Sequence, residues 1–365
     1  MDEPSVMRTD NVTRLVSGLT SPRSVDDYLQ LLDPWWSVQE VRARVVGVRP
    51  EMDQATSLFL MPNENWRGFR AGQFVQLSVA IAGTCQTRCF SVSSAPEDGQ
   101  PLRLTIKCIP SGRVSGWAKA GARVGDVVTL SQAQGAFVLP DPVPRRLLFV
   151  SGGSGITPIL SMVRHLAAAG YNGHIAWMHY ARRETMFGDE LARLASGPVA
   201  LRLSVFLTRP DAATEAPVRF SAEQLEAFEP AWADCETFVC GPEALSRAAT
   251  ALWGRRSLGD RLHVERFVPR ATGCAGRASD ATHRLTFAKS HRDAEGAAGG
   301  SLLEQAESAG LKPAYGCRMG ICHTCTCRKL SGTVRNELTG ETSSEADEEI
   351  RLCVSTPLSD VTLDL

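Results

Sequence analysis

The sequence lacks the features that would point to a membrane, a nucleic acid or a fibre. No run approaches the roughly 20 consecutive apolar residues that a membrane helix needs, and the first residues, MDEP, lack the charged-then-apolar pattern of a signal peptide. A formal net charge of −1 excludes the broad basic field that drives sequence-independent nucleic-acid binding. Internal repeats and low-complexity tracts are also absent. With 43% apolar and 22% charged residues, we expect a globular protein in the cytoplasm, with no membrane span of its own and no nucleic-acid partner.

Cysteine is the one residue type in excess, with eleven copies in 365 residues. In a reducing cytoplasm such cysteines are not expected to form a disulfide framework, and an odd number cannot pair completely within one chain. Five of them lie in the last fifty residues, namely Cys317, Cys322, Cys325, Cys327 and Cys353. This placement predicts metal or redox chemistry in the C-terminal part of the chain.

The chain is too long for one hydrophobic core, and its patterning changes along its length. Residues 1–37 are predicted to be a polar N-terminal extension. Short period-two runs within residues 38–142 predict an antiparallel β-barrel of six strands. In residues 143–270 apolar strands alternate with helical stretches, which predicts an α/β domain with a parallel, doubly wound sheet. The cysteine cluster falls in a third segment, residues 280–365.

The C-terminal cysteines have a characteristic spacing. Cys317-x4-Cys322-x2-Cys325, followed by Cys353 after 27 residues, is typical of plant-type [2Fe-2S] centres. A four-cysteine zinc site is the alternative, although zinc sites more often use paired C-x2-C arms. The spacing therefore favours four thiolate ligands around one iron–sulfur cluster.

The stretch AYGCRMGICHTCTC, with RLCVS further on, resembles the plant-type ferredoxin domain. The resemblance covers residues 280–365 and implies an α+β fold of the β-grasp type. It also implies that the four spaced cysteines hold a [2Fe-2S] cluster. Four ligands are complete without Cys327, so Cys327 is expected to be a small buried apolar residue rather than a fifth ligand. Where the family has a second hairpin strand this sequence has HRDAEGAAGG, and its Gly and Ala residues predict a frayed edge.

Residues 88–94, RCFSVSS, lie on a predicted strand of the barrel. Period two places Arg88 and Phe90 on one face and Ser91 on the other. An ordinary amphipathic strand would explain this pattern. A guanidinium for phosphate, a ring for stacking and a hydroxyl for a ring nitrogen would also suit a planar cofactor that carries phosphates.

This segment resembles the R-x-[YF]-S-x-x-S flavin motif of the ferredoxin-NADP reductase superfamily, with AGQF at 71–74 before it and GRVS at 112–115 after it. The resemblance implies that Arg88 neutralises the flavin phosphate, Phe90 stacks on the isoalloxazine and Ser91 hydrogen-bonds near N5. Phe90 replaces the commoner Tyr, which removes one hydroxyl contact. The turn at 112–115 favours FAD, with FMN as the alternative. The implied flavin-binding residues are Arg88, Phe90, Ser91, Ser94, Gly112, Val114 and Ser115.

Strand LLFVS leads into GGSGITP at 152–158 and then into a helix. Glycines at such a bend allow backbone N–H groups to bind a pyrophosphate, and Pro158 suits the first helical turn; a plain tight turn is the alternative. The loop resembles the superfamily's G-G-x-G-x-x-P loop, and CGPE at 240–243 resembles its C-G-P signature beside the nicotinamide. A buried strand cysteine would explain Cys240 equally well, but ligands of parallel sheets bind at strand ends. The implied nucleotide-binding residues are Gly152, Gly153, Gly155, Thr157, Pro158, Cys240, Gly241 and Pro242.

Further residues follow from the same resemblance. ERF at 265–267 is similar to the E-x-F ending that covers the other flavin face, which makes Phe267 a gate for the nicotinamide, or else a core phenylalanine. Thr208, Arg209 and Arg182 follow predicted strands and suit the 2′-phosphate of NADPH, with NADH as the alternative. The implied catalytic residues are Ser91, Cys240 and Phe267.

Taken together, residues 38–365 resemble a flavin reductase with a C-terminal ferredoxin domain. The resemblance implies an NAD(P)H oxidoreductase that passes electrons through FAD and a [2Fe-2S] cluster to a desaturase, hydroxylase or other oxygenase, either soluble or membrane-bound. A flavin is needed because hydride carries two electrons and the cluster accepts one. The extension, with Tyr28, Trp35 and Trp36, looks most like that of desaturase-partner reductases, and we expect a monomer. The alternatives are a redox-sensing flavo-iron–sulfur protein and a stand-alone NAD(P)H oxidase or dioxygenase reductase, for which no globin segment is present.

Overall fold

The computed structural model describes most of the chain, in two compact units. The described residues are 25–96, 101–110, 112–209, 218–267, 282–296, 300–315, 320, 324–337 and 340–365. The first unit contains residues up to Gln86 with Phe90–Val138 and Leu160–His165, and the second contains Thr87–Cys89, Leu139–Ile159 and Leu166–Leu365. Within the described residues, no helix is both long and apolar enough to cross a membrane.

A short helix, α2 (Val25–Leu32), precedes the first sheet. Asp26 holds the chain that follows it, because its carboxylate accepts hydrogen bonds from Ser37 Oγ at 2.6 Å and from the Val38 N–H at 2.7 Å. Asp33 forms an ion pair with Arg44 of β1 at 2.9 Å. The end of the predicted extension is thus attached to the barrel.

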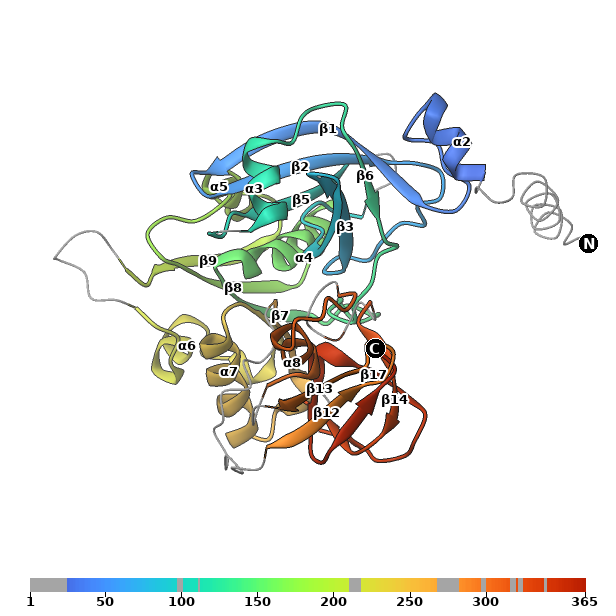
Figure 1. Cartoon of the computed structure of the whole chain (residues 1–365). Helices are drawn as coiled ribbons and strands as arrows, with labels where there is room; N and C mark the ends of the chain where they lie inside the picture. Colours follow the sequence, from blue (N-terminus) through green and yellow to red (C-terminus); the bar gives the residue numbers. More distant parts are fainter. Residues whose placement is uncertain are drawn as a thin grey trace, which may run out of the picture. The chain divides into compact units, whose positions relative to one another are not determined.

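Six strands of the N-terminal part form one sheet in the order β4-β3-β6-β1-β2-β5 (Figure 1). The pairs β1–β2, β1–β6, β2–β5 and β3–β6 are antiparallel. A bridge between Val92, directly after β4, and Leu104 of β5 links the two edge strands, so the sheet closes on itself. The predicted antiparallel barrel is confirmed. Its elements are β1 (Val41–Met52), β2 (Ala55–Pro62), β3 (Phe74–Ile81), β4 (Thr84–Ser91), β5 (Leu102–Lys107), α3 (Arg113–Ala120) and β6 (Val127–Leu130).

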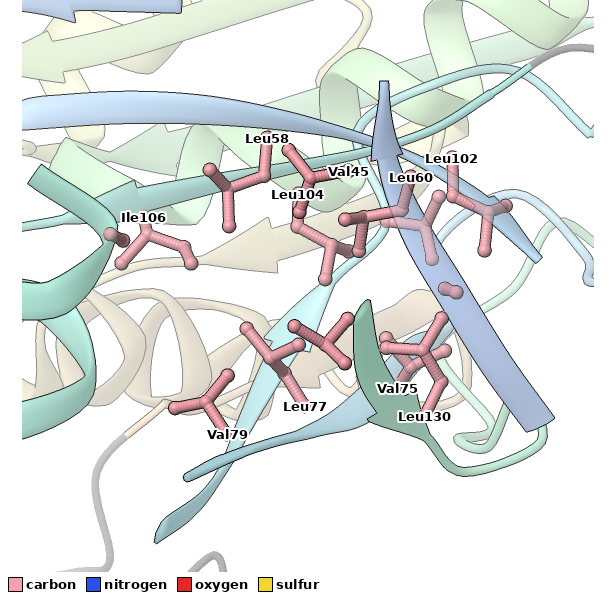
Figure 2. Packing of buried hydrophobic residues seen from close by; sticks show 14 of the residues in the cluster. Val45, Leu58, Leu60, Val75, Leu77, Val79, Leu102, Leu104, Ile106 and Leu130 are labelled. Carbon is pink, nitrogen blue, oxygen red and sulfur yellow. The ribbon is translucent and has the colours of Figure 1, made fainter. Parts of the chain in front are cut away.

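Alternation of apolar and polar residues builds the barrel core. On β1, Val41, Ala43 and Val45 are buried, while Arg42 and Arg44 between them are only partly buried. Figure 2 shows the matching side chains of the other strands gathered between the ribbons. Fully burying an aliphatic side chain of this size contributes about 1.5–3 kcal/mol, and a slip of one residue would move the whole set to the outer face. The apolar pattern therefore sets the strand register.

Five parallel strands form the second sheet, in the order β11-β10-β7-β8-β9 (Figure 1). The first strand, β7, lies in the middle, so the chain crosses to the other side of β7 when it returns to form β10. Ligands of such sheets bind at this switch point, at the carboxyl ends of the strands. The predicted parallel α/β domain is confirmed. Its strands are β7 (Arg146–Gly152), β8 (His174–Ala181), β9 (Ala200–Leu207), β10 (Glu236–Cys240) and β11 (Leu262–Glu265).

Helices cover this sheet. One face of β7 and β8 packs against α6 and α7 in a core that includes Val150, Met178, Leu225 and Trp253. The helices alternate with the strands along the chain, as crossovers between parallel strands require. The helices are α4 (Ile156–Ala168), α5 (Gly188–Ala195), α6 (Ala222–Phe228) and α7 (Glu243–Arg255), with single 3-10 turns at η1 (Gly153–Gly155), η2 (Trp232–Asp234) and η3 (Gly259–Arg261).

The C-terminal part has a mixed five-stranded sheet, β13-β12-β19-β14-β17, and a small three-stranded sheet, β16-β15-β18. Helix α8 begins with a capping box, in which Ser301 and Glu304 each satisfy a backbone N–H of the other. The α+β prediction is confirmed. The elements are β12 (His283–Phe287), β13 (Arg292–Gly296), α8 (Leu302–Ser308), β14 (Thr326–Ser331), β15 (Val334–Asn336), β16 (Thr342–Ser343), β17 (Glu348–Arg351), η4 (Leu352–Val354), β18 (Ser355–Pro357) and β19 (Val361–Leu363).

The predicted frayed edge is instead a paired strand over residues 292–296. Strand β13 pairs with β12 from His283 opposite Gly296 to Phe287 opposite Arg292. Gly296 fits this position because a Cβ atom there would lie 2.4 Å from Gln305 Oε1 of α8. A Cβ at this position would require the Gln305 side chain to move, a tertiary contact that the sequence does not show.

Candidate functional site

The strand predicted to bind the flavin is β4, and its serine at 91 has a property of a ligand site. Ser91 is buried, and its Oγ has no hydrogen-bond partner among the described residues. A buried hydroxyl without a partner is costly unless a ligand supplies one. Phe90 packs against the barrel core, and the Arg88 guanidinium donates to its neighbour's carbonyl, Thr87 O, at 2.7 Å. This strand can hold a flavin through the Ser91 hydroxyl and the Arg88 charge.

The side chains of Ser93 and Ser94 form hydrogen bonds with the backbone of Arg103. Ser94 Oγ accepts the N–H of Arg103 at 3.1 Å, and Ser93 Oγ donates to Arg103 O at 3.0 Å. Two residues of α4 bind the carbonyls of the same serines, since Ser161 Oγ donates to Ser94 O at 2.6 Å and Arg164 Nη1 to Ser93 O at 2.7 Å. The flavin strand is therefore fixed on both sides. The role of Ser94 as a flavin ligand stays a prediction.

A buried polar network lies under these serines. Ser57 Oγ is 2.7 Å from Thr105 Oγ1, which is 3.1 Å from Ser93 Oγ. Arg103, 1% exposed, forms an ion pair with Glu51 at 2.6 Å. Burial opposes the charge of Glu51, but the hydrogen bond to Ser57 and the charge of Arg103 lower its pKa below the usual range. The network makes the outer side of the flavin strand rigid.

The turn predicted to bind the flavin pyrophosphate precedes α3. Gly112 is the N-cap of the helix and forms no side-chain cap, so backbone N–H groups of the first turn are available to an anion. A Cβ at Gly112 would lie 2.3 Å from Ser115 Oγ. Ser115 Oγ itself accepts from Ile109 N and donates to Gly112 O, each at 3.3 Å, and Val114 is buried in the core. Any contribution of Val114 to phosphate binding would thus come from its backbone.

The glycine loop at the end of β7 is shaped by close packing against β10. A Cβ at Gly155 would lie 2.1 Å from the carbonyl oxygen of Cys240, and one at Gly152 would lie 2.8 Å from Pro242 Cδ. Gly153 has φ +54°, in the left-handed region that favours glycine. Thr157 Oγ1 donates to Ser154 O at 3.0 Å and closes the turn into α4. The loop leads its backbone directly into a helix N-terminus, as a pyrophosphate site requires.

Cys240 stands at the centre of a row of polar side chains that the sequence did not indicate. Glu265 of β11 and Ser151 of β7 are its register partners on either side, and His179 of β8 is the register partner of Ser151. All four residues lie within two residues of the carboxyl ends of their strands, where ligands bind. The sequence could indicate only that these residues lie near the ends of predicted strands. That they are neighbours follows from the strand register in the folded sheet.

Glu265 is the most unusual member of this row. Its Oε2 is shielded from solvent and has no hydrogen-bond partner among the described residues. Burial raises the pKa of Glu265 to about 8, so the carboxyl is protonated at neutral pH. Burial, and next the charge of Glu265, raises the pKa of the Cys240 thiol well above its usual range. Both groups are therefore neutral, and Glu265 offers an O–H donor.

Ser151 and His179 form the other half of the row. Trp177 Nε1 donates to Ser151 Oγ at 2.8 Å, so the hydroxyl proton of Ser151 is directed to His179 Nδ1, also at 2.8 Å. Burial lowers the pKa of His179 to about 4, which keeps the ring neutral. With Nδ1 accepting, the proton of His179 lies on Nε2. These contacts fix the last strand residue before the glycine loop.

The residues predicted for the coenzyme phosphate come together at the ends of β8 and β9. Thr208 N donates to Ala181 O and Arg209 N to Arg182 O, both at 2.8 Å. Arg182 and Arg209 are exposed, whereas Thr208 Oγ1 donates to Ala181 O at 3.1 Å. Two exposed guanidinium groups on adjacent strands suit a phosphate dianion.

Two of the four predicted cluster ligands can be placed. Cys325 and Cys353 are buried in one core, and the N–H of Leu352 donates to Cys325 O at 3.1 Å. Gly320 N donates to Cys353 Sγ at 3.2 Å, the kind of N–H···S contact that stabilises a thiolate ligand. Cys317 and Cys322 lie outside the described residues. Cys327 is buried in the same core, in agreement with its interpretation as an apolar residue.

Three family models match the chain in the order in which these sites occur. An oxidoreductase FAD-binding domain matches residues 52–139, an oxidoreductase NAD-binding domain matches residues 149–251, and a 2Fe-2S iron-sulfur cluster binding domain matches residues 285–358. The chain is 36% identical over 358 residues to an NADPH oxidoreductase of Mycobacterium tuberculosis, covering 96% of this chain and 91% of that protein. The chain belongs to the FAD- and [2Fe-2S]-containing NAD(P)H oxidoreductases.

Further relatives match this chain over most of their length. A glycine betaine monooxygenase reductase subunit of Pseudomonas aeruginosa is 30% identical over 352 residues, with 90% of this chain and 96% of that protein covered. A solved structure of phthalate dioxygenase reductase shares the fold with a TM-score of 0.59 and 23% identity, over 89% of this chain and 98% of that one. This oxidoreductase therefore uses FAD, a [2Fe-2S] cluster and NAD(P)H in one chain, and the orphaned Ser91 hydroxyl and the Cys353 thiol with its N–H donor fit those groups.

Proposed function

We propose that this oxidoreductase is the reductase component of an oxygenase-type system, which takes hydride from NADPH and delivers single electrons to a separate partner. The observation that carries the proposal is the combination, in one chain, of the glycine loop at 152–155 with the buried ligand pair Cys325 and Cys353. The match to a monooxygenase reductase subunit over nearly its whole length supports it.

The chemistry requires both cofactors. FAD, when bound, would supply the conversion of a two-electron hydride donor into a one-electron donor, and the cluster would supply a one-electron carrier. The protein's contribution is to orient the nicotinamide, to exclude water and to hold neutral polar groups near the reacting atoms. A stand-alone oxidase would need no cluster, so the cluster-binding domain favours delivery to a partner.

We assign roles at the nicotinamide end as follows. Glu265 donates a hydrogen bond through its carboxyl proton to the nicotinamide carboxamide, and the uncharged Cys240 packs against the ring. Ser91 donates to the flavin ring near N5. Phe267, half-buried at the end of its described segment, covers the flavin until the nicotinamide displaces it. Protonation matters for this role because a neutral carboxyl can donate a hydrogen bond, whereas a carboxylate can only accept one.

We propose that the cluster is held by Cys317, Cys322, Cys325 and Cys353. The spacing supports this set, and so do the burial of Cys325 and Cys353 and the N–H that Gly320 directs at the Cys353 sulfur. Substitution of any one ligand by Ser is expected to abolish the cluster spectrum.

NADPH is the proposed coenzyme. Arg182 and Arg209 place two exposed cations at the ends of adjacent strands, with Thr208 between them. The 2′-phosphate that distinguishes NADPH from NADH is a dianion that such cations bind. The name of the Mycobacterium tuberculosis relative, NADPH oxidoreductase, is in keeping with this choice.

For the acceptor we propose an iron oxygenase, with a desaturase as the narrower candidate. Relatives named for glycine betaine monooxygenase and propane 2-monooxygenase support the broader class. We place the reaction in the cytoplasm, where NADPH is available and thiols stay reduced, and propose a monomer. The proposed domain limits are 1–37, 38–142, 143–270 and 280–365.

Anaerobic stopped-flow mixing with NADPH tests the proposal. We expect flavin bleaching first and cluster reduction second, followed by rapid reoxidation when an oxygenase or desaturase component is added. Arg88→Ala, which lacks the proposed phosphate ligand, is expected to lose FAD and both absorbance changes. Cluster reduction at an unchanged rate in flavin-free protein would contradict the electron sequence.

A further inference from the structure

Three consecutive residues of the C-terminal part contact the segments that carry the cluster ligands. The Arg351 guanidinium donates to Gly320 O, the Leu352 N–H donates to Cys325 O at 3.1 Å, and Cys353 Sγ accepts from Gly320 N at 3.2 Å. The second contact joins two backbone atoms, so it does not depend on the side chain at 352. The third uses the sulfur of a proposed cluster ligand. The first depends on the identity of the side chain at 351.

Gly320 is held at both of its polar atoms. Its carbonyl oxygen accepts from Arg351 Nη1, and its N–H points at the Cys353 sulfur. Its φ of +72° is in the left-handed region, which glycine adopts at no steric cost. Since the left-handed conformation directs N–H and C=O to different sides, a donor on the carbonyl helps to keep the N–H aimed at the sulfur. Gly320 thereby links the Arg351 guanidinium to the Cys353 sulfur.

No ion pair among the described residues compensates the charge of Arg351. Ion pairs among the described residues of this part of the chain use Arg284, Lys289, Arg328, Lys329 and Arg335, and Arg351 is not among them. Arg351 is half-buried on β17, opposite Thr326 of β14, the residue next to Cys325. A fixed cation beside thiolate ligands stabilises the more negative, reduced form of the cluster.

We propose that Arg351 is a positioning residue for the [2Fe-2S] cluster: it holds Gly320 in the conformation that directs its N–H at Cys353 Sγ, and it raises the reduction potential of the cluster through its charge. This inference rests on the proposed ligand set, in which Cys325 and Cys353 bind the cluster. Its consequence is directional, because a higher cluster potential favours electron flow from the flavin to the cluster.

The chain offers a matched control. Arg328 lies on β14, next to β17, and carries the same charge, but it is 55% exposed and pairs with Asp347 at 2.8 Å. Arg328→Gln therefore removes one cation from the same sheet without touching Gly320. Arg351→Lys keeps the charge but replaces the planar, multi-donor guanidinium with an ammonium on a different stem.

The test is a redox titration of the purified holoprotein, followed by EPR and visible circular dichroism, with iron and sulfide measured in each variant. In Arg351→Gln we expect the equilibrium constant for cluster reduction to fall at least tenfold, which lowers the reduction potential by 59 mV for a one-electron couple. Arg351→Lys is expected to shift it less, and Arg328→Gln less than threefold. If Arg351→Gln is purified without its cluster, Arg351→Lys is compared with Arg328→Gln instead. The reduction potential and the rate of cluster loss to a chelator are then measured in both variants.

The outcomes separate this inference from the proposed function. A wild-type protein without a [2Fe-2S] signal would overturn the cluster assignment itself. A normal wild-type signal with a loaded Arg351→Gln cluster whose equilibrium stays within threefold of the wild type would overturn only the role of Arg351. An equal shift in Arg328→Gln would do the same, because the effect would then follow from general charge. Cluster loss no faster in Arg351→Lys than in Arg328→Gln, with equal potentials, would also overturn it.

Discussion

Glu265 lies directly beside Cys240, as its register partner at the carboxyl ends of β11 and β10. Burial raises the pKa of both side chains, that of Glu265 to about 8, and Glu265 Oε2 has no partner among the described residues. A neutral carboxyl next to a neutral thiol, at the switch point of a parallel sheet, offers a hydrogen bond without a charge. The pair therefore defines the nicotinamide end of the proposed hydride path.

The first prediction concerns pH. Glu265 has a folded-state pKa near 8, above the roughly 4.3 of an unfolded glutamate. Its contribution to stability is thus fully present below about pH 4.3 and is lost as the pH rises through 8, at no more than about 1.4 kcal/mol per pH unit. Urea unfolding between pH 5.5 and 8.5 should show this decline in the wild type and a flatter curve in Glu265→Gln. Parallel curves for the two proteins would contradict the assignment; Glu226→Gln, an exposed carboxylate of α6, is the control.

Ser91→Ala removes the Ser91 hydroxyl and is expected to change the rate of flavin reduction much more than the thermal stability. Its hydroxyl has no protein partner to lose, so the melting temperature should change by no more than about 2 °C. If the hydroxyl assists hydride transfer to the flavin, reduction by NADPH should slow by roughly 10²-fold with FAD retained. Stopped-flow absorbance and thermal unfolding measure the two effects. Ser93→Ala, which breaks bonds to Arg103 and Thr105, should show the reverse pattern, a larger loss of stability than of rate.

Gly155→Ala tests the packing of the nucleotide loop. The added Cβ would lie 2.1 Å from Cys240 O, so either the loop or the end of β10 must shift. We expect the KM for NADPH to rise at least tenfold, with FAD and cluster content unchanged. Gly254→Ala in α7 is the matched control, because a Cβ there meets nothing within 4 Å and alanine favours the helix by about 0.5–1 kcal/mol. Equal KM values in the two variants would exclude the loop from nucleotide binding.

Arg209→Ala addresses coenzyme choice. Loss of a guanidinium on the 2′-phosphate removes a charge-assisted bond of about 1.5–3 kcal/mol. The KM for NADPH should therefore rise by roughly one to two orders of magnitude, while the KM for NADH changes little. Steady-state kinetics with both coenzymes measure the ratio, and Arg193→Ala on the exposed face of α5 controls for general charge. An equal rise for both coenzymes would remove Arg209 from the phosphate site.

Periodicity and motif spacing were sufficient to predict the three-part architecture, because alternation on β1 and the apolar strands around β7 are local signals. The site was only partly predictable. Ser151, His179 and Glu265 belong to the row around Cys240 through strand register, which no local pattern reports. The flavin motif at 88–94 likewise gave no sign that Ser94 Oγ accepts a hydrogen bond from the Arg103 N–H.

The C-terminal part shows the same limit. The spacing of its cysteines predicted the cluster, but Arg351 carries no motif and meets Gly320 only because β17 and the ligand segments fold together. Likewise, the close approach of Gln305 to Gly296 is a tertiary contact that the local sequence does not report.

In the proposed electron path, hydride reaches the flavin and its electrons leave singly through the cluster. Anaerobic titration of Cys353→Ser with NADPH, followed by visible absorbance and EPR, tests it most directly. We predict full flavin bleaching at the wild-type rate with no [2Fe-2S] signal, and no electron delivery to an oxygenase. Loss of flavin reduction together with the cluster, or undiminished delivery without the cluster, would contradict the account.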